Sequence, residues 1–182
     1  MIDSVYLLEL IFIIHLFKYC NYMNIPFHKP SLPQNYNELV SNSITGGWLT
    51  TGPEVKVFEK KIATYTESEN IVAVNSCTAA LHLAFAAKGY GEGNKFIVPS
   101  YTFVASAEIG EYLGMQPVLI DCDEDLNLDL NQVYDAVKMD NKIKAIVPVH
   151  MAGKPVDMLK VYEIAEKFNL FILEDAAHAL ES

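Results

Sequence analysis

The sequence predicts an α/β fold in which a mostly parallel sheet lies between two layers of helices. Short, continuously apolar runs alternate with longer segments whose apolar residues recur every three or four positions. Continuously apolar strands are typical of a sheet covered on both faces, and strand–helix alternation favours parallel pairing with right-handed crossovers. With 182 residues, 51% hydrophobic and 20% charged, the chain is long enough for one domain with a sizeable core.

The elements are predicted in chain order. The strands are expected at residues 71–74, 96–98, 117–120, 145–149 and 170–173. The helices are expected at residues 54–65, 78–88, 102–113, 130–138 and 156–168. Asp129 and Asp157 stand at the starts of the last two helices, where an acidic cap or first-turn acid stabilises the helix. We expect residues 31–53 to be loop and the glycine-rich residues 89–94 to be a turn.

The first 22 residues differ in character from the rest. Residues 5–17 are apolar apart from Glu9 and His15, a run too short for a membrane span of about 20 residues. The basic start and small-residue cleavage site of a signal peptide are also missing. We therefore interpret residues 1–22 as an upstream extension before Met23, and residues 23–182 as the structured part. A short amphipathic anchor is the alternative.

Charge and cysteine usage exclude several classes of function. A formal net charge of -10 argues against a nucleic-acid surface, which needs clustered Lys and Arg. Cys20, Cys77 and Cys122 lie far apart, with no Cys-x-x-Cys pair. This spacing predicts neither a disulfide framework nor a zinc site, and it fits a reducing cytoplasm. We expect no membrane partner, no nucleic-acid partner and no metal.

The loops after the predicted strands hold the candidate binding residues, because ligands of open parallel sheets bind at the carboxyl ends of the strands. Cys77 and Thr78 begin an Ala-rich helix shortly after residues 71–74. The free N–H groups and the dipole of such a helix start form an anion site, worth about 0.3–1 kcal/mol per charge. Ordinary N-capping is the alternative interpretation.

Three further residues suit a planar heterocycle. Phe103, shortly after a strand, can lie against a flat ring, although a core aromatic is the alternative. Asp175 follows an apolar strand, and a carboxylate facing a pyridine nitrogen keeps that nitrogen protonated, which makes the ring an electron sink. An acidic helix cap is the alternative. His178 is either a partner for a ring hydroxyl or a surface histidine.

Six segments, taken together and in order, are far more specific than any one of them. They are WLTTGP, VKVFE, NSCTAALH, VPSYTFVAS, PVHMAGKPVDM and EDAAHA. Over residues 25–182 the chain resembles the N-terminal half of the DegT/DnrJ/EryC1/StrS sugar aminotransferases, pyridoxal-phosphate enzymes that make amino sugars on nucleotide carriers. The resemblance implies the large domain of the type I fold of these transferases, a three-layer αβα structure, incomplete at its C-terminal end. It also implies a cytoplasmic homodimer.

The resemblance implies a role at the cofactor for five residues. Cys77 and Thr78 match the positions that hold the phosphate, although Cys77 stands where the family often has Gly. Phe103 matches the aromatic that stacks on the pyridine ring. Asp175 matches the carboxylate on the ring nitrogen, and His178 matches the position that contacts the ring hydroxyl.

The resemblance also bears on substrate and catalysis. Trp48 and Thr51 belong to a GWLTTGP segment that looks like the version in enzymes that aminate C4 of a UDP-sugar, with glutamate as the donor. In the family a Gly-rich stretch and then the Schiff-base lysine follow the EDAAHA-like motif. The expected lysine therefore lies beyond Ser182, and no residue of this chain is predicted to be catalytic.

Four functions follow from these observations. The first is pyridoxal-phosphate-dependent amination of a nucleotide-linked keto-sugar, and the second is an inert fragment that lacks the lysine. The third is a related sugar dehydratase, in which a histidine replaces that lysine. A dinucleotide- or ATP-binding domain is disfavoured, because neither G-x-G-x-x-G after the first strand nor G-x-x-x-x-G-K-[ST] occurs.

Overall fold

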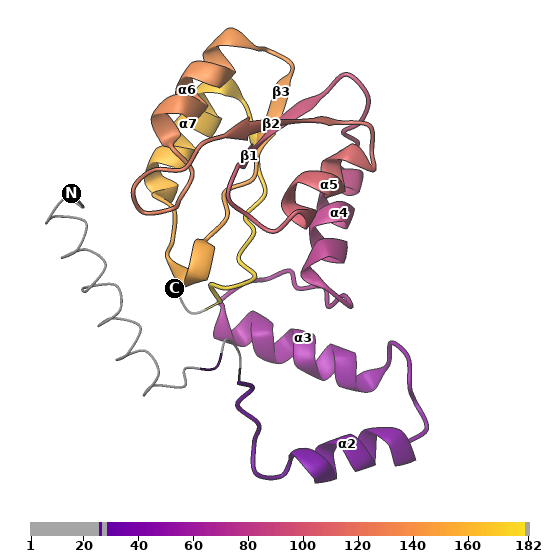
Figure 1. Ribbon diagram of the computed structural model, residues 1–182. Helices are drawn as coiled ribbons and strands as arrows, with labels where there is room; N and C mark the ends of the chain where they lie inside the picture. The colour runs from indigo at the N-terminus through magenta and orange to yellow at the C-terminus, as the bar shows by residue number, and fades with distance from the viewer. Residues whose placement is uncertain (1–25, 27–28, 181–182) are drawn as a thin grey trace, which may run out of the picture. The chain divides into compact units, whose positions relative to one another are not determined.

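The computed structural model of the chain describes residue 26 and residues 29–180 (Figure 1). The predicted leader, residues 1–22, lies outside the described residues. The chain divides into two compact units, residues 1–61 and residues 62–182. The second unit contains the whole sheet.

A four-stranded parallel sheet forms the centre of the second unit. Its strands are β1 (Lys95–Pro99), β2 (Gln116–Ile120), β3 (Ile143–Ile146) and β4 (Phe171–Ile172). Their order across the sheet is β2-β1-β3-β4, and each neighbouring pair is parallel. The prediction of a parallel sheet is confirmed.

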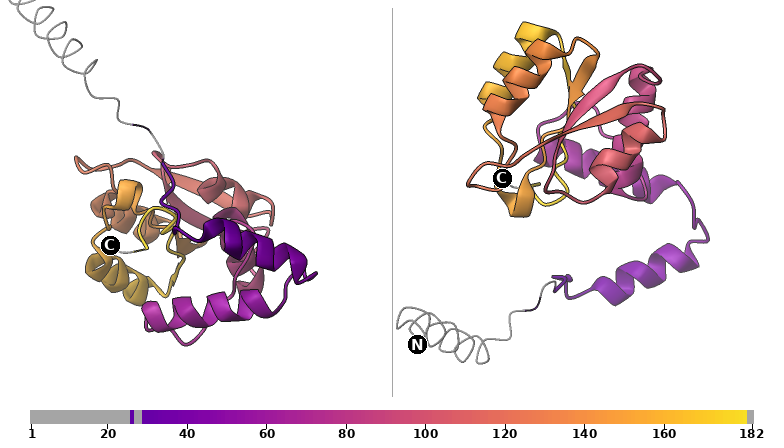
Figure 2. Two further views of the ribbon diagram at one scale, coloured as in Figure 1. Left: turned by 90° about the horizontal axis from the view of Figure 1, so that it is seen from below. Right: turned by 45° about the horizontal axis from the view of Figure 1, so that its top comes forward.

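Helices cover both faces of this sheet. They are α4 (Cys77–Lys88), α5 (Ala105–Glu111), α6 (Leu130–Met139) and α7 (Met158–Phe168). One face packs against α4 and α5 and the other against α6 and α7, as the right-hand view of Figure 2 also shows. The predicted three-layer αβα arrangement is therefore present in this unit.

Successive side chains of β1 point alternately into two separate hydrophobic cores. Phe96 and Val98 pack in the cluster that includes side chains of α4 and α5, whereas Ile97 packs in the cluster with α6 and α7. All three side chains are fully buried. Successive residues of a strand point to opposite faces, so a strand enclosed by helices on both sides must be apolar throughout. Each such side chain contributes about 1.5–3 kcal/mol by its burial.

The helix starts follow the predicted acidic caps. The Asp129 carboxylate accepts hydrogen bonds from the N–H groups of Asn131 and Gln132 at the start of α6. The Asp157 carboxylate accepts one from the N–H of Lys160, so α7 begins at residue 158, two residues later than predicted. These caps satisfy N–H groups that have no partner within the helix.

Two predictions were wrong. Residues 31–53 were expected to be loop, but they contain the helix α2 (Tyr36–Thr45). Its Ser, Asn and Thr residues weaken the helical signal by competing for backbone hydrogen bonds. Residues 71–74 were expected to form a strand, but none of the four described strands pairs with them. An apolar run becomes a strand only where a neighbouring strand satisfies its backbone groups.

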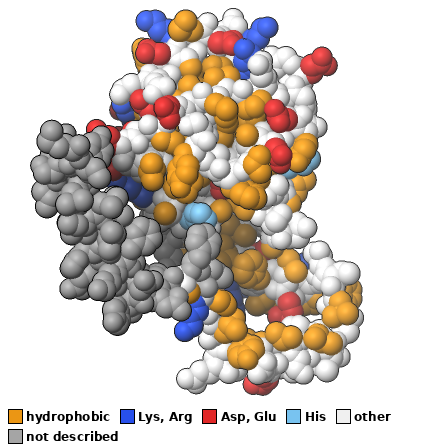
Figure 3. Space-filling view, viewed as in Figure 1, with side chains coloured by type: hydrophobic (Ala, Val, Ile, Leu, Met, Phe, Trp, Pro, Cys, Tyr) orange, Lys and Arg blue, Asp and Glu red, His pale blue; other side chains and the backbone are white. Residues whose placement is uncertain are grey.

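The described part of the first unit consists of α2, most of α3 (Pro53–Tyr65) and the segments beside them. Neither helix has a fully buried residue. Hydrophobic side chains are exposed along both helices, as Figure 3 shows in orange; they include Leu39, Val40, Ile44, Val57 and Phe58. No helix in the described ranges is long and apolar enough to cross a membrane.

Candidate cofactor-binding site

Asp175 is held in place by the sheet. It lies three residues after β4 and forms a parallel bridge with Val149, beyond the end of β3. Its N–H donates to the carbonyl of Pro148 at 2.9 Å, and its carbonyl accepts from the N–H of His150 at 3.1 Å. Asp175 is only 7% exposed. The backbone therefore fixes this carboxylate at the carboxyl end of the sheet, as the sequence predicted.

Among the described residues, only neutral groups donate to the Asp175 carboxylate. The Ser106 hydroxyl donates to Oδ2 at 2.8 Å, and Oδ1 accepts from the N–H of Ala177 at 3.3 Å and from the Cys77 thiol at 3.6 Å. Within the described residues, no Lys, Arg or His forms an ion pair with Asp175. A buried carboxylate without a cationic partner is complementary to a ligand that brings a positive charge.

The Asp175 carboxylate borders a cavity that also receives an aromatic ring. The cavity has a volume of about 50 Å³, and Phe103 and His178 line it together with Thr102 and His150. Phe103 is 73% exposed. Its ring is therefore not a core aromatic, and it is free to contact a flat ligand. Three residues predicted at the cofactor thus meet at one cavity.

The N-terminus of α4 lies beside the same carboxylate. The Ser76 hydroxyl caps this helix by accepting from the N–H of Ala79 at 3.1 Å. The N–H groups of Cys77 and Thr78 donate to no acceptor among the described residues. Burial, and then the charge of Asp175, raise the pKa of the Cys77 thiol, so this thiol is a donor at neutral pH. Ser76 thus caps α4, while the N–H groups of Cys77 and Thr78 have no acceptor among the described residues and could donate to an anion.

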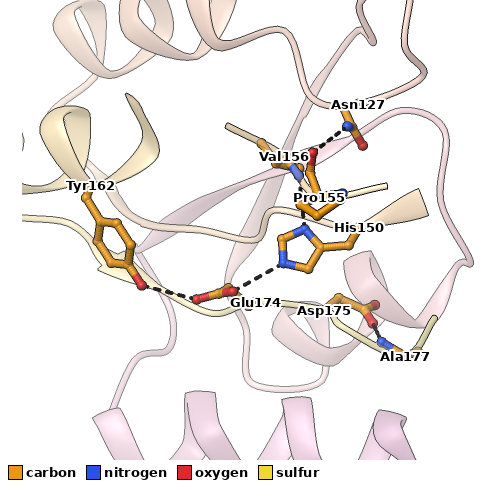
Figure 4. A network of polar contacts seen from close by, with 8 residues as sticks. All are labelled: Asn127, His150, Pro155, Val156, Tyr162, Glu174, Asp175 and Ala177. Atoms are coloured by element: carbon orange, nitrogen blue, oxygen red, sulfur yellow. Dashed lines mark hydrogen bonds and ion pairs between the residues drawn. The ribbon is translucent and has the colours of Figure 1, made fainter. Parts of the chain in front are cut away.

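A second polar network fixes the segment before Asp175 (Figure 4). The Nδ1 atom of His150 accepts from the N–H of Val156 at 3.2 Å, so its proton lies on Nε2, which is 3.2 Å from Glu174 Oε2. The Tyr162 hydroxyl donates to Glu174 Oε1 at 3.3 Å. The charge of Glu174, and then burial, raise the pKa of Tyr162, which keeps this hydroxyl protonated. The network ties the loop after β3 to the segment that carries Asp175.

Trp48 and Thr51, the predicted substrate-binding residues, lie in the first unit. The indole N–H of Trp48 donates to the main-chain carbonyl of Thr51 at 2.9 Å. A Cβ atom added to Gly52 would lie 2.2 Å from Cδ1 of Trp48. The absence of a side chain at Gly52 thus makes room for the indole ring, which is 63% exposed.

Sequence reasoning missed two buried polar residues at this site, Ser106 and His150. Ser106 follows Phe103 by three positions within VPSYTFVAS, and His150 lies within PVHMAGKPVDM. Both segments are among the six that carry the family resemblance, but no local sequence pattern marks these two side chains as site residues. Their importance comes from contacts with Asp175 and Glu174, which lie 69 and 24 positions away.

The donor set fits pyridoxal phosphate. The Asp175 carboxylate suits a protonated ring nitrogen, Phe103 suits the face of the ring, and the free N–H groups of Cys77 and Thr78 suit a phosphate. The volume is smaller than the roughly 300–1,000 Å³ of typical ligand pockets. The described residues around this cavity can therefore supply only part of the enclosure that a ligand of this size needs.

A larger cavity, of about 430 Å³, lies between α6 and α7. It is lined by helical side chains such as Tyr134, Lys160 and Lys167. The two lysines already donate to protein acceptors, to Asn131 and Tyr134 respectively. None of the buried polar side chains in the described part of the chain borders it. We therefore assign the candidate site to the smaller cavity at Asp175.

The chain is similar in sequence and structure to several known proteins. The chain is 41% identical over 157 residues to the spore coat polysaccharide biosynthesis protein SpsC of Bacillus subtilis (strain 168), covering 86% of this chain and 40% of SpsC. It resembles Spr1654 of Streptococcus pneumoniae, described as a sugar aminotransferase, in its PLP form, with a TM-score of 0.81 and 32% identity. That likeness covers 87% of this chain and 44% of Spr1654.

A third relative is DesV of S. venezuelae, solved in complex with a ketimine intermediate, with a TM-score of 0.72 and 35% identity. The likeness covers 83% of this chain and 44% of DesV. The chain thus spans less than half the length of these relatives. The two solved structures have the type I fold of pyridoxal-phosphate-dependent aminotransferases. The model of the DegT/DnrJ/EryC1/StrS aminotransferase family matches residues 30–182. The chain belongs to the DegT/DnrJ/EryC1/StrS aminotransferase family.

Proposed function

We propose that this chain contributes the ring and phosphate contacts of a pyridoxal 5'-phosphate site. One observation carries the proposal: the buried carboxylate of Asp175 has only neutral donors among the described residues, and it faces the same cavity as Phe103 and His178. When bound, the cofactor supplies an electron-withdrawing ring that stabilises negative charge on the substrate carbon.

Each residue has a separate task in this proposal. Asp175 pairs with the ring nitrogen and keeps it protonated, which a charge-assisted hydrogen bond favours by about 1.5–3 kcal/mol. Phe103 covers one face of the ring and excludes water from it. His178 contacts the ring hydroxyl. Cys77 and Thr78 donate their free N–H groups to the phosphate at the positive end of α4.

For the whole protein we propose transfer of an amino group from glutamate to a nucleotide-linked keto-sugar. Membership of a sugar aminotransferase family supports amination of a sugar, and SpsC belongs to polysaccharide biosynthesis. The UDP-4-keto-sugar is the finer proposal, and it rests on the segment that holds Trp48 and Thr51. We further propose a cytoplasmic homodimer.

Ligand titration tests the cofactor site directly. Pyridoxamine 5'-phosphate is the suitable probe, because its amine forms no imine with surface lysines. We expect its fluorescence to change on binding to the wild-type chain, and we expect Asp175→Asn to weaken binding at least about tenfold. Asp121→Asn is the matched control, because Asp121 also accepts from a serine hydroxyl but is exposed. Equal binding by all three proteins would refute the assignment of Asp175.

The nucleotide proposal has its own test. Trp48 is the only tryptophan in the sequence, so its fluorescence reports on the GWLTTGP segment. We expect UDP to quench this fluorescence at concentrations where UMP and inorganic phosphate do not. Quenching by all three ligands alike would indicate non-specific anion binding and would contradict a nucleotide site here.

A further inference from the structure

Two hydroxyl groups and the Asp175 carboxylate form a chain of hydrogen bonds. Ser106, on α5, is completely buried, and its hydroxyl donates to Asp175 Oδ2 at 2.8 Å. The Thr102 hydroxyl lies 2.9 Å from the Ser106 hydroxyl. Thr102 borders the cavity, whereas Ser106 does not. The two side chains therefore connect the cavity wall to the carboxylate through the protein interior.

The direction of these hydrogen bonds follows from the number of protons. A serine hydroxyl has one proton to donate, and an ionised carboxylate can only accept. The proton of Ser106 is used on Asp175, so Thr102 must be the donor in its contact with Ser106. The order Thr102 to Ser106 to Asp175 polarises both bonds the same way, and each strengthens the other in a low-dielectric interior.

The other partners of Asp175 explain what this pair of hydroxyls does. Oδ1 has two donors, Ala177 and Cys77, but the Cys77 contact at 3.6 Å involves a weak thiol donor. Ser106 is the one described donor to Oδ2, and it makes the shortest of these contacts. Rotation of the carboxylate about its Cβ–Cγ bond would break this bond and leave Oδ2 without a donor among the described residues. Ser106 therefore favours the orientation of the carboxylate plane seen in the structure.

We propose that Ser106, supported by Thr102, is a positioning residue that orients the Asp175 carboxylate toward the ring nitrogen of the cofactor. The inference rests on the proposed pyridoxal-phosphate site and adds to it a residue that touches no cofactor atom. Ser106 acts only through Asp175, so its contribution depends on whether the ligand has a basic ring nitrogen. A purely structural role for Ser106 would not depend on that nitrogen.

This difference defines the experiment. Two probes are titrated into the full chain by fluorescence: pyridoxamine 5'-phosphate and its 1-deaza analogue, in which C–H replaces the ring nitrogen. The wild-type chain is expected to prefer the first probe. Ser106→Ala is expected to weaken binding of that probe about tenfold, the size of one charge-assisted hydrogen bond, and to leave binding of the deaza analogue unchanged. The preference between the probes is the readout.

Two further variants make the test decisive. Thr102→Val keeps the shape of the side chain but removes its hydroxyl, and we expect it to reduce the preference in the same direction, by several-fold. It decides the question if Ser106→Ala fails to fold, which circular dichroism would show. Ser100→Ala is the matched control, because Ser100 also donates to a carboxylate, that of Asp121, but at an exposed site, and it should keep the full preference.

The possible results separate this inference from the proposed function. If the wild-type chain binds neither probe, the cofactor site is wrong, and the role of Ser106 is wrong with it. If the wild-type chain prefers the probe with the ring nitrogen but Ser106→Ala weakens both probes equally, or neither, only the role of Ser106 is overturned. An unchanged preference in Thr102→Val would overturn the supporting role of Thr102 and, if Ser106→Ala does not fold, the role of Ser106 as well.

Discussion

The thiol of Cys77 lies 3.6 Å from the carboxylate Oδ1 of Asp175, although 98 positions separate the two residues in sequence. By resemblance, these residues serve opposite ends of a cofactor, the phosphate and the ring nitrogen. The structure places them in direct contact. A ligand that accepts hydrogen bonds from the N–H groups at the start of α4 can therefore also contact the Asp175 carboxylate at its other end, because Cys77 lies next to both.

We expect Asp175→Asn to speed alkylation of Cys77 by iodoacetamide near pH 8. Burial is the largest cause of the raised pKa of this thiol, and the charge of Asp175 is the next. Removing that charge lowers the pKa, so more thiolate is present at a fixed pH, and the rate should rise several-fold. Peptide mass spectrometry separates the cysteines, and Cys122 is the internal control. An unchanged rate at Cys77 would contradict the contact.

We expect Gly110→Ala to destabilise the fold although alanine favours helices. A Cβ atom at this position of α5 would lie 2.2 Å from Cε1 of Phe96, whose side chain is fully buried. Helix propensity favours alanine by about 1 kcal/mol, but overpacking costs about 1–3 kcal/mol. Urea denaturation should show a net loss of up to about 2 kcal/mol. Phe96→Leu in the same chain should recover part of it, and a stabilised single variant would refute the clash.

We expect Gly52→Ala to displace the indole of Trp48. The added Cβ would overlap the ring, so the hydrogen bond from Trp48 to the Thr51 carbonyl should break. The fluorescence of the single tryptophan should then change in emission maximum and in quenching by acrylamide. Thr51→Ala is the control, because that bond uses the main-chain carbonyl, and its spectrum should match the wild type. Identical spectra for Gly52→Ala and wild type would count against this turn.

We expect Asp129→Ala to lower stability by about 0.5–2 kcal/mol at pH 7, the usual effect of removing an N-cap. The side-chain hydrogen bond from Gln132 is the main cause that lowers the pKa of Asp129. The ionised carboxylate thus stabilises the fold above its unfolded-state pKa, near 3.9, and this stabilisation is lost as pH falls through the lower folded-state pKa.

Urea denaturation at pH 7 and at pH 3 checks this predicted loss of stabilisation at low pH. The difference between wild type and Asp129→Ala should shrink at the lower pH. Asp135→Ala, an exposed acid on the same helix, serves as the control and should show little effect at either pH. A difference that stays constant with pH would mean that the charge of Asp129 does not contribute.

The sequence predicted those features whose causes are local. Asp129 and Asp157 could be placed at helix starts because a cap acts on N–H groups two or three residues away. The buried strands could be placed because enclosure by helices on both faces requires continuous apolar runs. In α2 the apolar residues Tyr36, Leu39 and Val40 do have helical spacing, but the polar residues between them masked it.

The features that the sequence could not predict depend on distant partners. Whether residues 71–74 form a strand depends on a neighbour, which no local pattern specifies. Ser106 looks like any small polar residue of a helix until the fold brings it to Asp175, 69 positions away. Asp175 and Phe103 could be proposed as site residues because their residue types match a known order of motifs, whereas Ser106, which contacts Asp175, has no such signature.

The parallel order of the sheet has a consequence for assembly. In a parallel sheet, the chain reaches the carboxyl edge again only after it has passed through a connecting helix. The groups around Asp175 therefore come from four separate stretches of chain, near residues 77, 106, 150 and 177. No single hairpin or helix pair can present them together. A small molecule captured there would bind only the assembled unit, and its concentration would raise the unfolding midpoint of every strand at once.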